Sequence, residues 1–296
     1  MTNRQETAIA RAALTWIFAK VYVFERSDAF DWLLRFKVPA LVDSLNCERW
    51  FFTRYVDDTG LHLRIRFEVD ARSCAESKQT IVRALELEFD ALERFRDQRW
   101  YLPKSAADPA VFGSLVEPRR TTVVFEPHRP EVSFCGPAAN DIVESLFSYS
   151  SRLAVDVLDR LDDRTLERSI ALGLMHATAA ALVPAAERRG FWVEYRDFWT
   201  RSVPSAGWIA ALFKKATSMD VRAVNDELRA LEPECRGYAV ALDIAREELN
   251  RTEPAFLAQR ASLQQVIHLM NNRLGLSPLE EAYLAEILQL AHAAET

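Results

Sequence analysis

The most regular alternation of hydrophobic and polar residues in the sequence lies in Leu61–Val69. Every second residue there is aliphatic or aromatic, and the residues between them are His62, Arg64, Arg66 and Glu68. A period of two places the two sets on opposite faces of a β-strand. The pattern therefore predicts a strand with one face in the core and the other face carrying ionisable side chains.

The residues before Leu61–Val69 predict its partner strand. Trp50–Tyr55 is rich in aromatic residues, and the polar, glycine-containing residues 56–60 separate it from the alternating segment. Two strand-like segments joined by a short polar turn are typical of a β-hairpin. We expect the alternating hydrophobic residues to lie in the core, and Arg64 and Arg66 to face a cleft.

Other segments of the N-terminal half predict further strands and helices. Leu14–Phe24 and Thr121–Phe125 are dense in β-branched and aromatic residues and predict strands. Asp28–Leu45 and residues 75–99 carry hydrophobic residues three and four apart, as amphipathic helices do. A proline-containing loop is expected over Leu102–Pro118. This half is therefore expected to form an antiparallel sheet with flanking helices.

The sequence from Pro137 onward predicts almost only helices. Proline has no N–H and its ring clashes with the preceding turn, so each proline in this half can stop or offset a helix. These prolines are Pro184, Pro204, Pro233 and Pro254. The last two helices are expected at residues 258–273 and 278–293, with Gly275 suited to the C-cap of the first and Ser277 to the N-cap of the second.

Together these patterns predict an α+β fold. An antiparallel sheet with a hairpin and flanking helices comes first, over residues 14–135. A mostly helical half follows, over residues 136–296, and packs on it. We expect residues 1–296 to form a single domain.

Composition and charge exclude several classes of protein. Lys and Arg number 37 against 43 Asp and Glu, and the net charge of −6 argues against a nucleic-acid partner. The first residues lack the apolar stretch of a signal peptide, and no window is apolar enough to cross a membrane. We read the cysteines as reduced thiols of a cytoplasmic protein, because no two of them form a CxxC pair. They are Cys47, Cys74, Cys135 and Cys235.

The common motifs for nucleotide binding, hydrolysis and zinc binding are absent, so neither a cofactor nor a metal ion is expected. What remains is Arg64 and Arg66 on one strand face, with His62 beside them and Arg54 on the neighbouring arm. Two guanidinium groups that project the same way repel unless an anion lies between them, and they suit carboxylate or amide oxygens. Spacing alone leaves two interpretations open: a polar binding cleft, or a solvated face with surface ion pairs.

His268 lies in a strongly apolar helical segment, with Asn272 four residues later on the same face. A lone histidine in such a helix is often a packed core residue. Histidine side chains in general titrate near neutral pH, and this also makes His268 the best candidate for a general acid or base in this chain. Among the other histidines, His176 is expected to pack among apolar residues and His292 to lie at the surface, while His128 lies in a proline-rich loop.

Three stretches of the sequence resemble one known family. Residues 50–67 are similar to the W-x-F-x-R-Y…H-L-R-x-R signature of the C-terminal domain of class I lanthipeptide dehydratases and of stand-alone thiopeptide biosynthesis proteins. Residues 135–152 resemble the family's G-G-P…L-F…S-R helix, and residues 268–275 its H-M-x-x-N-R-x-x-G stretch. The resemblance runs from about Trp16 to the C-terminus. Because 296 residues leave no room for the large glutamylation domain of full-length dehydratases, we expect a stand-alone protein.

The resemblance implies candidate catalytic residues. It matches Arg64 and Arg66 to two arginines of the eliminating domains and His268 to their C-terminal histidine. It also implies that the C-terminal helix folds back so that His268 lies within reach of the arginines. We add Tyr55 as a second candidate for proton transfer. The residues expected to contact substrate are Arg54, His62, Arg129 and Asn272.

The sequence departs from the family pattern at two positions. A third arginine is expected directly before a glutamate, and this position falls on Pro130 before Glu131, with Arg129 adjacent. The first glycine of the G-G pair is replaced by Cys135. These departures leave fewer cations to hold a glutamyl carboxylate.

We therefore favour a pyridine synthase of thiopeptide biosynthesis. Such an enzyme joins two dehydroalanines of a modified, azole-containing precursor peptide in a formal aza-[4+2] cycloaddition, then loses water and the leader peptide. The alternative is elimination of glutamate from glutamylated Ser or Thr to form dehydroamino acids. A third hypothesis is a non-catalytic partner that binds the leader peptide by strand addition. The oligomeric state stays open.

Overall fold

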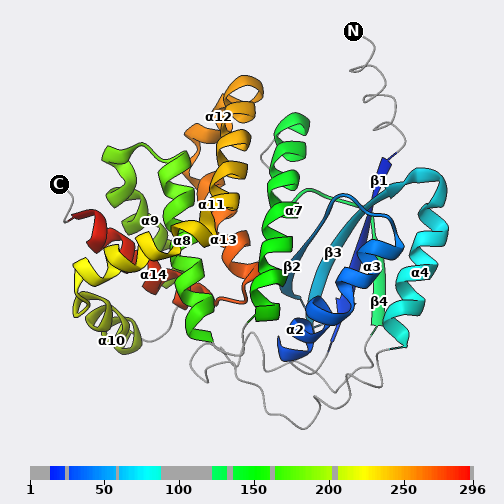
Figure 1. Cartoon of the computed structure of the whole chain (residues 1–296), viewed down its shortest axis with the longest axis horizontal. Helices are drawn as coiled ribbons and strands as arrows, with labels where there is room; N and C mark the ends of the chain where they lie inside the picture. Colours follow the sequence, from blue (N-terminus) through cyan, green and yellow to red (C-terminus); the bar gives the residue numbers. More distant parts are fainter. Residues whose placement is uncertain are drawn as a thin grey trace. The chain divides into compact units, whose positions relative to one another are not determined.

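The computed structural model describes residues 14–23, 27–57, 60–87, 122–131, 136–160, 164–201 and 206–293 (Figure 1). The chain divides into two compact units, Met1–Arg129 and Pro130–Thr296. The division falls close to the predicted change from sheet-rich to helical sequence. The single domain, and the packing of one half on the other, stay predictions.

The N-terminal unit is built on a four-stranded antiparallel sheet with the strand order β2-β3-β1-β4. The strands are β1 (Leu14–Tyr22), β2 (Trp50–Asp57), β3 (Gly60–Asp70) and β4 (Thr122–Glu126). The predicted hairpin is formed by β2 and β3, in which Asp57 pairs with Gly60. Gly60 has a φ of 138°, which favours glycine because it has no Cβ.

The described residues of this unit also form three helices and a short 3-10 helix. They are α2 (Ser27–Phe36), α3 (Val38–Ser44), η1 (Ala71–Ser73) and α4 (Cys74–Glu86). The single helix expected over residues 28–45 is therefore two helices. Pro39 lies in the first turn of α3, where its missing N–H costs nothing, whereas a continuous helix would bring its ring against the carbonyl of Arg35. The expected helix over residues 75–99 is present as α4; the rest of it, and the loop Leu102–Pro118, lie outside the described residues.

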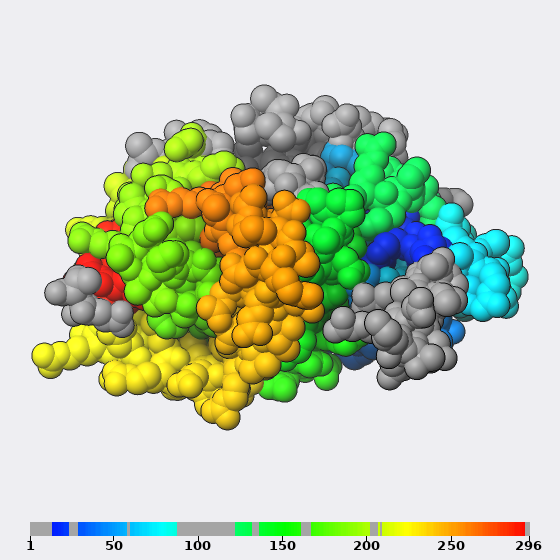
Figure 2. Space-filling view, turned by 90° about the horizontal axis from the view of Figure 1, so that it is seen from above, coloured from blue at the N-terminus to red at the C-terminus, as the bar shows by residue number. Residues whose placement is uncertain are grey.

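The C-terminal unit is helical, as expected. The helices in its described residues are α7 (Pro137–Arg160), α8 (Arg164–Leu182), η3 (Ala185–Glu187), α9 (Arg188–Thr200), α10 (Ala206–Thr217), α11 (Val221–Thr252), α12 (Pro254–Ala258), α13 (Arg260–Arg273) and α14 (Pro278–Ala293). Figure 2 shows α11, coloured yellow to orange, at the surface of this unit.

The prolines of this half have different effects. Pro184 follows α8 and Pro254 begins α12, as expected, while Pro204 lies outside the described residues. The expectation for Pro233 was wrong, because it lies inside the continuous helix α11. Leu231 and Cys235 on either side of it are buried. Burial of the apolar face of this long helix outweighs the cost of about 3 kcal/mol that proline adds to a helix interior.

The junction between α13 and α14 agrees with the expected caps. Gly275 has a φ of 83° and donates its N–H to the carbonyl of Asn272, at 3.0 Å. At the start of α14, the N–H of Ser277 donates to Oε2 of Glu280 (2.9 Å), and the N–H of Glu280 donates to Oγ of Ser277 (3.3 Å). This reciprocal pair is a capping box, which fixes where α14 begins.

The expected surface position of His292 was wrong. His292 is only 8% exposed, and its ring stacks on that of His176 with the ring centroids 5.5 Å apart. Helix α14 is apolar on most of its circumference, and such a helix is buried on most sides. His176, expected to pack, is half-buried.

Candidate functional site

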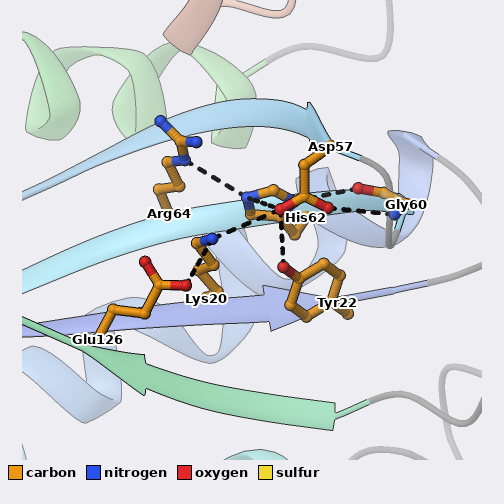
Figure 3. A network of polar contacts seen from close by, with 7 residues as sticks. All are labelled: Lys20, Tyr22, Asp57, Gly60, His62, Arg64 and Glu126. Atoms are coloured by element: carbon orange, nitrogen blue, oxygen red, sulfur yellow. Dashed lines mark hydrogen bonds and ion pairs between the residues drawn. The ribbon is translucent and has the colours of Figure 1, made fainter.

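Side chains from all four strands meet on the face of the sheet opposite to Leu63, Ile65 and Phe67 (Figure 3). Those three hydrophobic residues are at most 1% exposed, as expected. We call the polar side chains that Figure 3 shows connected on this opposite face the sheet network. Its members are Lys20, Tyr22, Asp57, His62, Arg64 and Glu126.

Asp57 connects the sheet network at the hairpin turn. It accepts hydrogen bonds from the hydroxyl of Tyr22 (2.9 Å), from Nζ of Lys20 (3.4 Å) and from the N–H of Gly60 (3.3 Å). Lys20 also forms an ion pair of 2.7 Å with Glu126. Burial acts to lower the pKa of Lys20, but the hydrogen bond and charge of Glu126, with Asp57, outweigh it and raise that pKa above 10.5. Lys20 is therefore a cation whose charge is already compensated.

His62 is fully buried within the sheet network. Its Nδ1 lies 3.1 Å from the carbonyl oxygen of Gly60, and Nε of Arg64 lies 3.4 Å from its Nε2. A carbonyl oxygen can only accept, so Nδ1 carries the proton and Nε2 accepts from Arg64. Burial, with the charges of Arg64 and Lys20, lowers the pKa of His62 below 6.5. His62 is therefore a neutral residue that orients Arg64.

Arg64 is held on two sides. Besides its bond to His62, its guanidinium carbon lies 3.3 Å from the centre of the Tyr55 ring, a cation–π contact. Tyr55 is 45% exposed and Arg64 is half-buried. The structure thus brings together three predicted site residues, and it places an oriented guanidinium where carboxylate or carbonyl oxygens can reach it.

Arg66 differs from Arg64 although both project from the same face of β3. It is 2% exposed, and its guanidinium carbon lies 4.2 Å from the ring centre of Phe18 and 5.1 Å from that of Phe51. One Nη contacts the backbone carbonyl of Arg129 at 3.5 Å. Arg129, which is exposed, therefore contributes an oxygen acceptor beside Arg66. That the two arginines line a cleft stays a prediction.

The structure separates Arg54 from the sheet network. Arg54 pairs with Leu63 in the strand register and therefore projects toward the opposite, apolar face. There it forms an ion pair of 2.7 Å with Asp31 of α2. The alternation within Trp50–Asp57 contains this information, because Tyr55 and Arg54 are neighbours and must point to opposite faces.

His268 lies in a second polar group, within the helical unit. Its Nδ1 lies 2.9 Å from Oε1 of Glu281, which is fully buried. The other oxygen of Glu281 accepts from the hydroxyl of Tyr195 and from Nδ2 of Asn271 (3.2 Å). We call these residues, with Trp199, the histidine cluster. The asparagine that belongs to this group is Asn271. Asn272 is half-buried, and its backbone carbonyl accepts a hydrogen bond from the N–H of Gly275.

Three helices supply the histidine cluster. Tyr195 and Trp199 are four residues apart on α9, and the ring centre of Trp199 lies 4.3 Å from that of His268. His268 and Asn271 are three residues apart on α13. Residues three or four apart share a helix face, so each helix presents its two residues on one face. Burial, and then the charge of Glu281, raise the pKa of Tyr195 well above 10, so its hydroxyl keeps the proton and donates.

Sequence reasoning missed Tyr195 and Glu281. Glu281 lies in α14 on a face rich in apolar residues, and its neighbours Ala282, Leu284 and Ala285 are buried. A carboxylate among such residues needs hydrogen-bond donors, so its position was a usable signal. The identity of the donors was not readable, because Tyr195 lies 86 residues away in the chain.

The described residues provide no group of three or more His, Cys, Asp or Glu side chains that could hold a metal ion. No helix among them is long and apolar enough to span a membrane. The described cysteines, Cys47, Cys74 and Cys235, are free thiols.

The solved structures that share this fold include the following three. Over 95% of this chain and 98% of its own, the pyridine synthase TbtD from thiomuracin biosynthesis matches with a TM-score of 0.70 at 19% identity. The tRNA-dependent lantibiotic dehydratase MibB from Microbispora sp. 107891 matches over 95% of this chain and 28% of its own, with a TM-score of 0.58 at 20% identity. TsrL matches over 95% of both chains, with a TM-score of 0.57 at 15% identity.

A search of curated proteins finds no match to the sequence. The sequence model of the lantibiotic biosynthesis dehydratase C-terminal family matches residues 16–293, nearly the whole chain. This agrees with the motifs in residues 50–67, 135–152 and 268–275 and with the α+β fold. The chain belongs to the lantibiotic biosynthesis dehydratase C-terminal family.

Proposed function

We propose that the protein is a pyridine synthase acting on a modified precursor peptide. The observation that carries this choice is the environment of Arg66: it is buried against Phe18 and Phe51, and Arg129 offers it a carbonyl oxygen. Because Arg66 is only 2% exposed, its guanidinium is poorly placed to bind the carboxylate of a glutamylated substrate, as elimination would require. The similarity in fold to TbtD, with the higher TM-score, supports the same choice.

A cycloaddition needs positioning and proton transfer, and no covalent nucleophile. Holding the two dehydroalanines in a near-reactive geometry can supply about 7–11 kcal/mol of the barrier. One amide must first become an imidic acid, with its proton moving from nitrogen to oxygen, to give the 2-azadiene. After the two new bonds form, water leaves and then the leader peptide leaves as a carboxamide, which completes the aromatic ring.

The surroundings of each group support the role that we propose for it. His268, hydrogen-bonded to Glu281, moves the proton in the tautomerisation and in the later eliminations. Arg64, oriented by His62 and Tyr55, binds and polarises a carbonyl oxygen of the peptide. Tyr55, with its exposed ring, contacts the peptide beside it.

The second candidate is elimination of glutamate from glutamylated Ser or Thr. It is favoured by the match to the dehydratase MibB, which has nearly the same identity to this chain as TbtD. In that reaction His268 removes the proton next to the carbonyl group, and Arg64 binds the leaving carboxylate. The two candidates therefore share residues and differ in substrate.

Two peptides distinguish the candidates. The purified chain is incubated with a leader-bearing peptide that contains azoles and two dehydroalanines, and separately with a glutamylated peptide, and both products are followed by mass spectrometry. A pyridine synthase converts the first into a macrocycle with loss of water and of the leader mass. Release of glutamate from the second, with the first unchanged, would establish elimination instead. A protein that only binds the leader changes neither peptide.

The leader provides a further test. A flexible peptide needs contacts remote from the reacting atoms to offset the cost of ordering two alkenes. Adding the same core peptide without its leader should therefore slow turnover sharply, although the leader takes no part in the bonds that form.

A further inference from the structure

We infer that Glu281 is a positioning residue that holds the imidazole of His268 with its proton on Nδ1 and presents Nε2 to the substrate. The inference rests on the proposed role of His268 in proton transfer. It goes beyond that role because it assigns the ring nitrogen that exchanges the proton and the residue that holds the ring in place.

The hydrogen bonds of Glu281 assign the proton. Oε1 of Glu281 is hydrogen-bonded to Nδ1 of His268. Oε2 accepts hydrogen bonds from the hydroxyl of Tyr195 and from Nδ2 of Asn271. A carboxylate can only accept, and Tyr195 and Asn271 both donate to it. The remaining partner, Nδ1, therefore donates as well, which leaves Nε2 as the unprotonated nitrogen.

The surroundings of the ring enclose the side chain of His268 only in part. Nδ1 faces a fully buried carboxylate, yet the side chain of His268 is 19% exposed. Trp199 lies against the ring at 4.3 Å between centroids and restricts its rotation. Among the described residues, Nε2 has no hydrogen-bond partner, so it is the nitrogen that can exchange a proton with a bound peptide.

A second buried carboxylate on α14, that of Glu286, has a permanent counter-ion and provides a comparison with Glu281. Glu286 of α14 is 6% exposed, and it forms an ion pair of 2.7 Å with Arg196, a permanent cation. The described partners of Glu281 are two neutral donors and one imidazole. Its charge gains a full counter-ion only when His268 takes up a proton. This arrangement stabilises the imidazolium that forms during proton transfer.

The test is a nitrogen NMR spectrum of the full chain with isotope-labelled histidine, recorded without peptide. One-bond and two-bond couplings distinguish the two neutral tautomers, and the His268→Gln variant assigns the signal among the five histidines. We expect the Nδ1–H tautomer for His268. If His268 in the unmodified protein is instead the Nε2–H tautomer, that spectrum alone contradicts the inference.

Two matched variants complete the experiment. In Glu281→Leu the acceptor is lost, so the His268 signal should move toward the Nε2–H form, and turnover should fall on the order of 10²-fold. In Glu286→Leu another buried carboxylate of α14 is lost, and the tautomer should stay unchanged. An unchanged tautomer in Glu281→Leu, or an equal change in both variants, would contradict the positioning role. Because the spectrum needs no peptide, a protein that turns over neither substrate would refute the proposed function and leave the tautomer result standing.

Discussion

The sheet network and the histidine cluster use buried charge in different ways. In the sheet network, Lys20 lies between Asp57 and Glu126, so opposite charges compensate each other across the strands. In the histidine cluster, one buried carboxylate has neutral donors and a single titratable ring as its described partners. The first arrangement leaves no charge of Lys20 uncompensated beside Arg64, which His62 and Tyr55 orient, and this suits binding. The second is completed only by a proton, which suits acid–base chemistry.

This difference predicts the largest effect for His268→Ala. Turnover should fall on the order of 10²- to 10⁴-fold, because general acid–base catalysis contributes that much. The free energy of unfolding should change far less, since the side chain is partly exposed. Single-turnover kinetics followed by mass spectrometry, with urea unfolding alongside, measure both. His176→Ala, another histidine of the helical unit, serves as the control and should keep normal turnover. Equal losses in the two variants would assign His268 to packing.

The next effect separates Arg64 from Arg66. Arg64→Ala removes a charged hydrogen-bond donor worth about 1.5–3 kcal/mol, so KM for the peptide should rise about 10- to 100-fold while stability changes by less than about 1 kcal/mol. Arg66→Ala truncates a side chain buried against two aromatic rings and should destabilise the protein by about 3 kcal/mol. The exposed Arg72, paired with Asp70, provides the control Arg72→Ala. If Arg66→Ala leaves stability unchanged and raises KM more than Arg64→Ala, the assigned roles are reversed.

A smaller effect concerns the pH dependence of stability. The pKa of His62 is lowered below 6.5 in the folded chain, chiefly by burial, so the unfolded chain binds a proton first as the pH falls. The free energy of unfolding should therefore decrease as the pH is lowered from 7 to 5, and rise again on return to pH 7. The His62→Gln variant should show a shallower slope in urea unfolding at the two pH values. A steeper or unchanged slope would mean that His62 is not the group responsible.

The smallest effect is expected for Tyr195→Phe. This variant removes one of the donors to Glu281 and should lower the free energy of unfolding by about 1 kcal/mol. The tautomer of His268 should not change, because Oε1 of Glu281 still accepts from Nδ1. Thermal unfolding and the histidine spectrum test the two parts separately. Loss of the Nδ1–H tautomer here would show that Tyr195, rather than Glu281 alone, sets the orientation of the ring.

The sheet was largely readable from the sequence, and the helical site was not. Alternation in Leu61–Val69 assigned both faces of β3, because a strand has one geometry and a period of two. The same rule applied to β2 would have separated Arg54 from Tyr55. Helical spacing, by contrast, places Asn271 and Asn272 equally well near His268, since residues three and four apart both share a face. Which amide joins the cluster depends on α9 and α14, whose positions are set by tertiary packing.

The prolines teach the same lesson about tertiary packing. Pro39 and Pro254 lie in the first turns of their helices, as local sterics alone predict. Pro233 lies within α11 because the buried side chains on both sides of it contribute more than the local cost. Local rules predict where a helix can start. They do not predict where a long amphipathic helix is strong enough to continue.

The capping box at Ser277 has a consequence for the chemistry four residues later. Each residue of an α-helix turns the chain by about 100° and advances it by about 1.5 Å. If α14 began one residue earlier or later, Glu281 would be rotated away from His268 and another side chain would take its place. Ser277 and Glu280 fix the first turn of α14. They thereby set the rotation of the helix at which the carboxylate of Glu281 contacts the imidazole of His268.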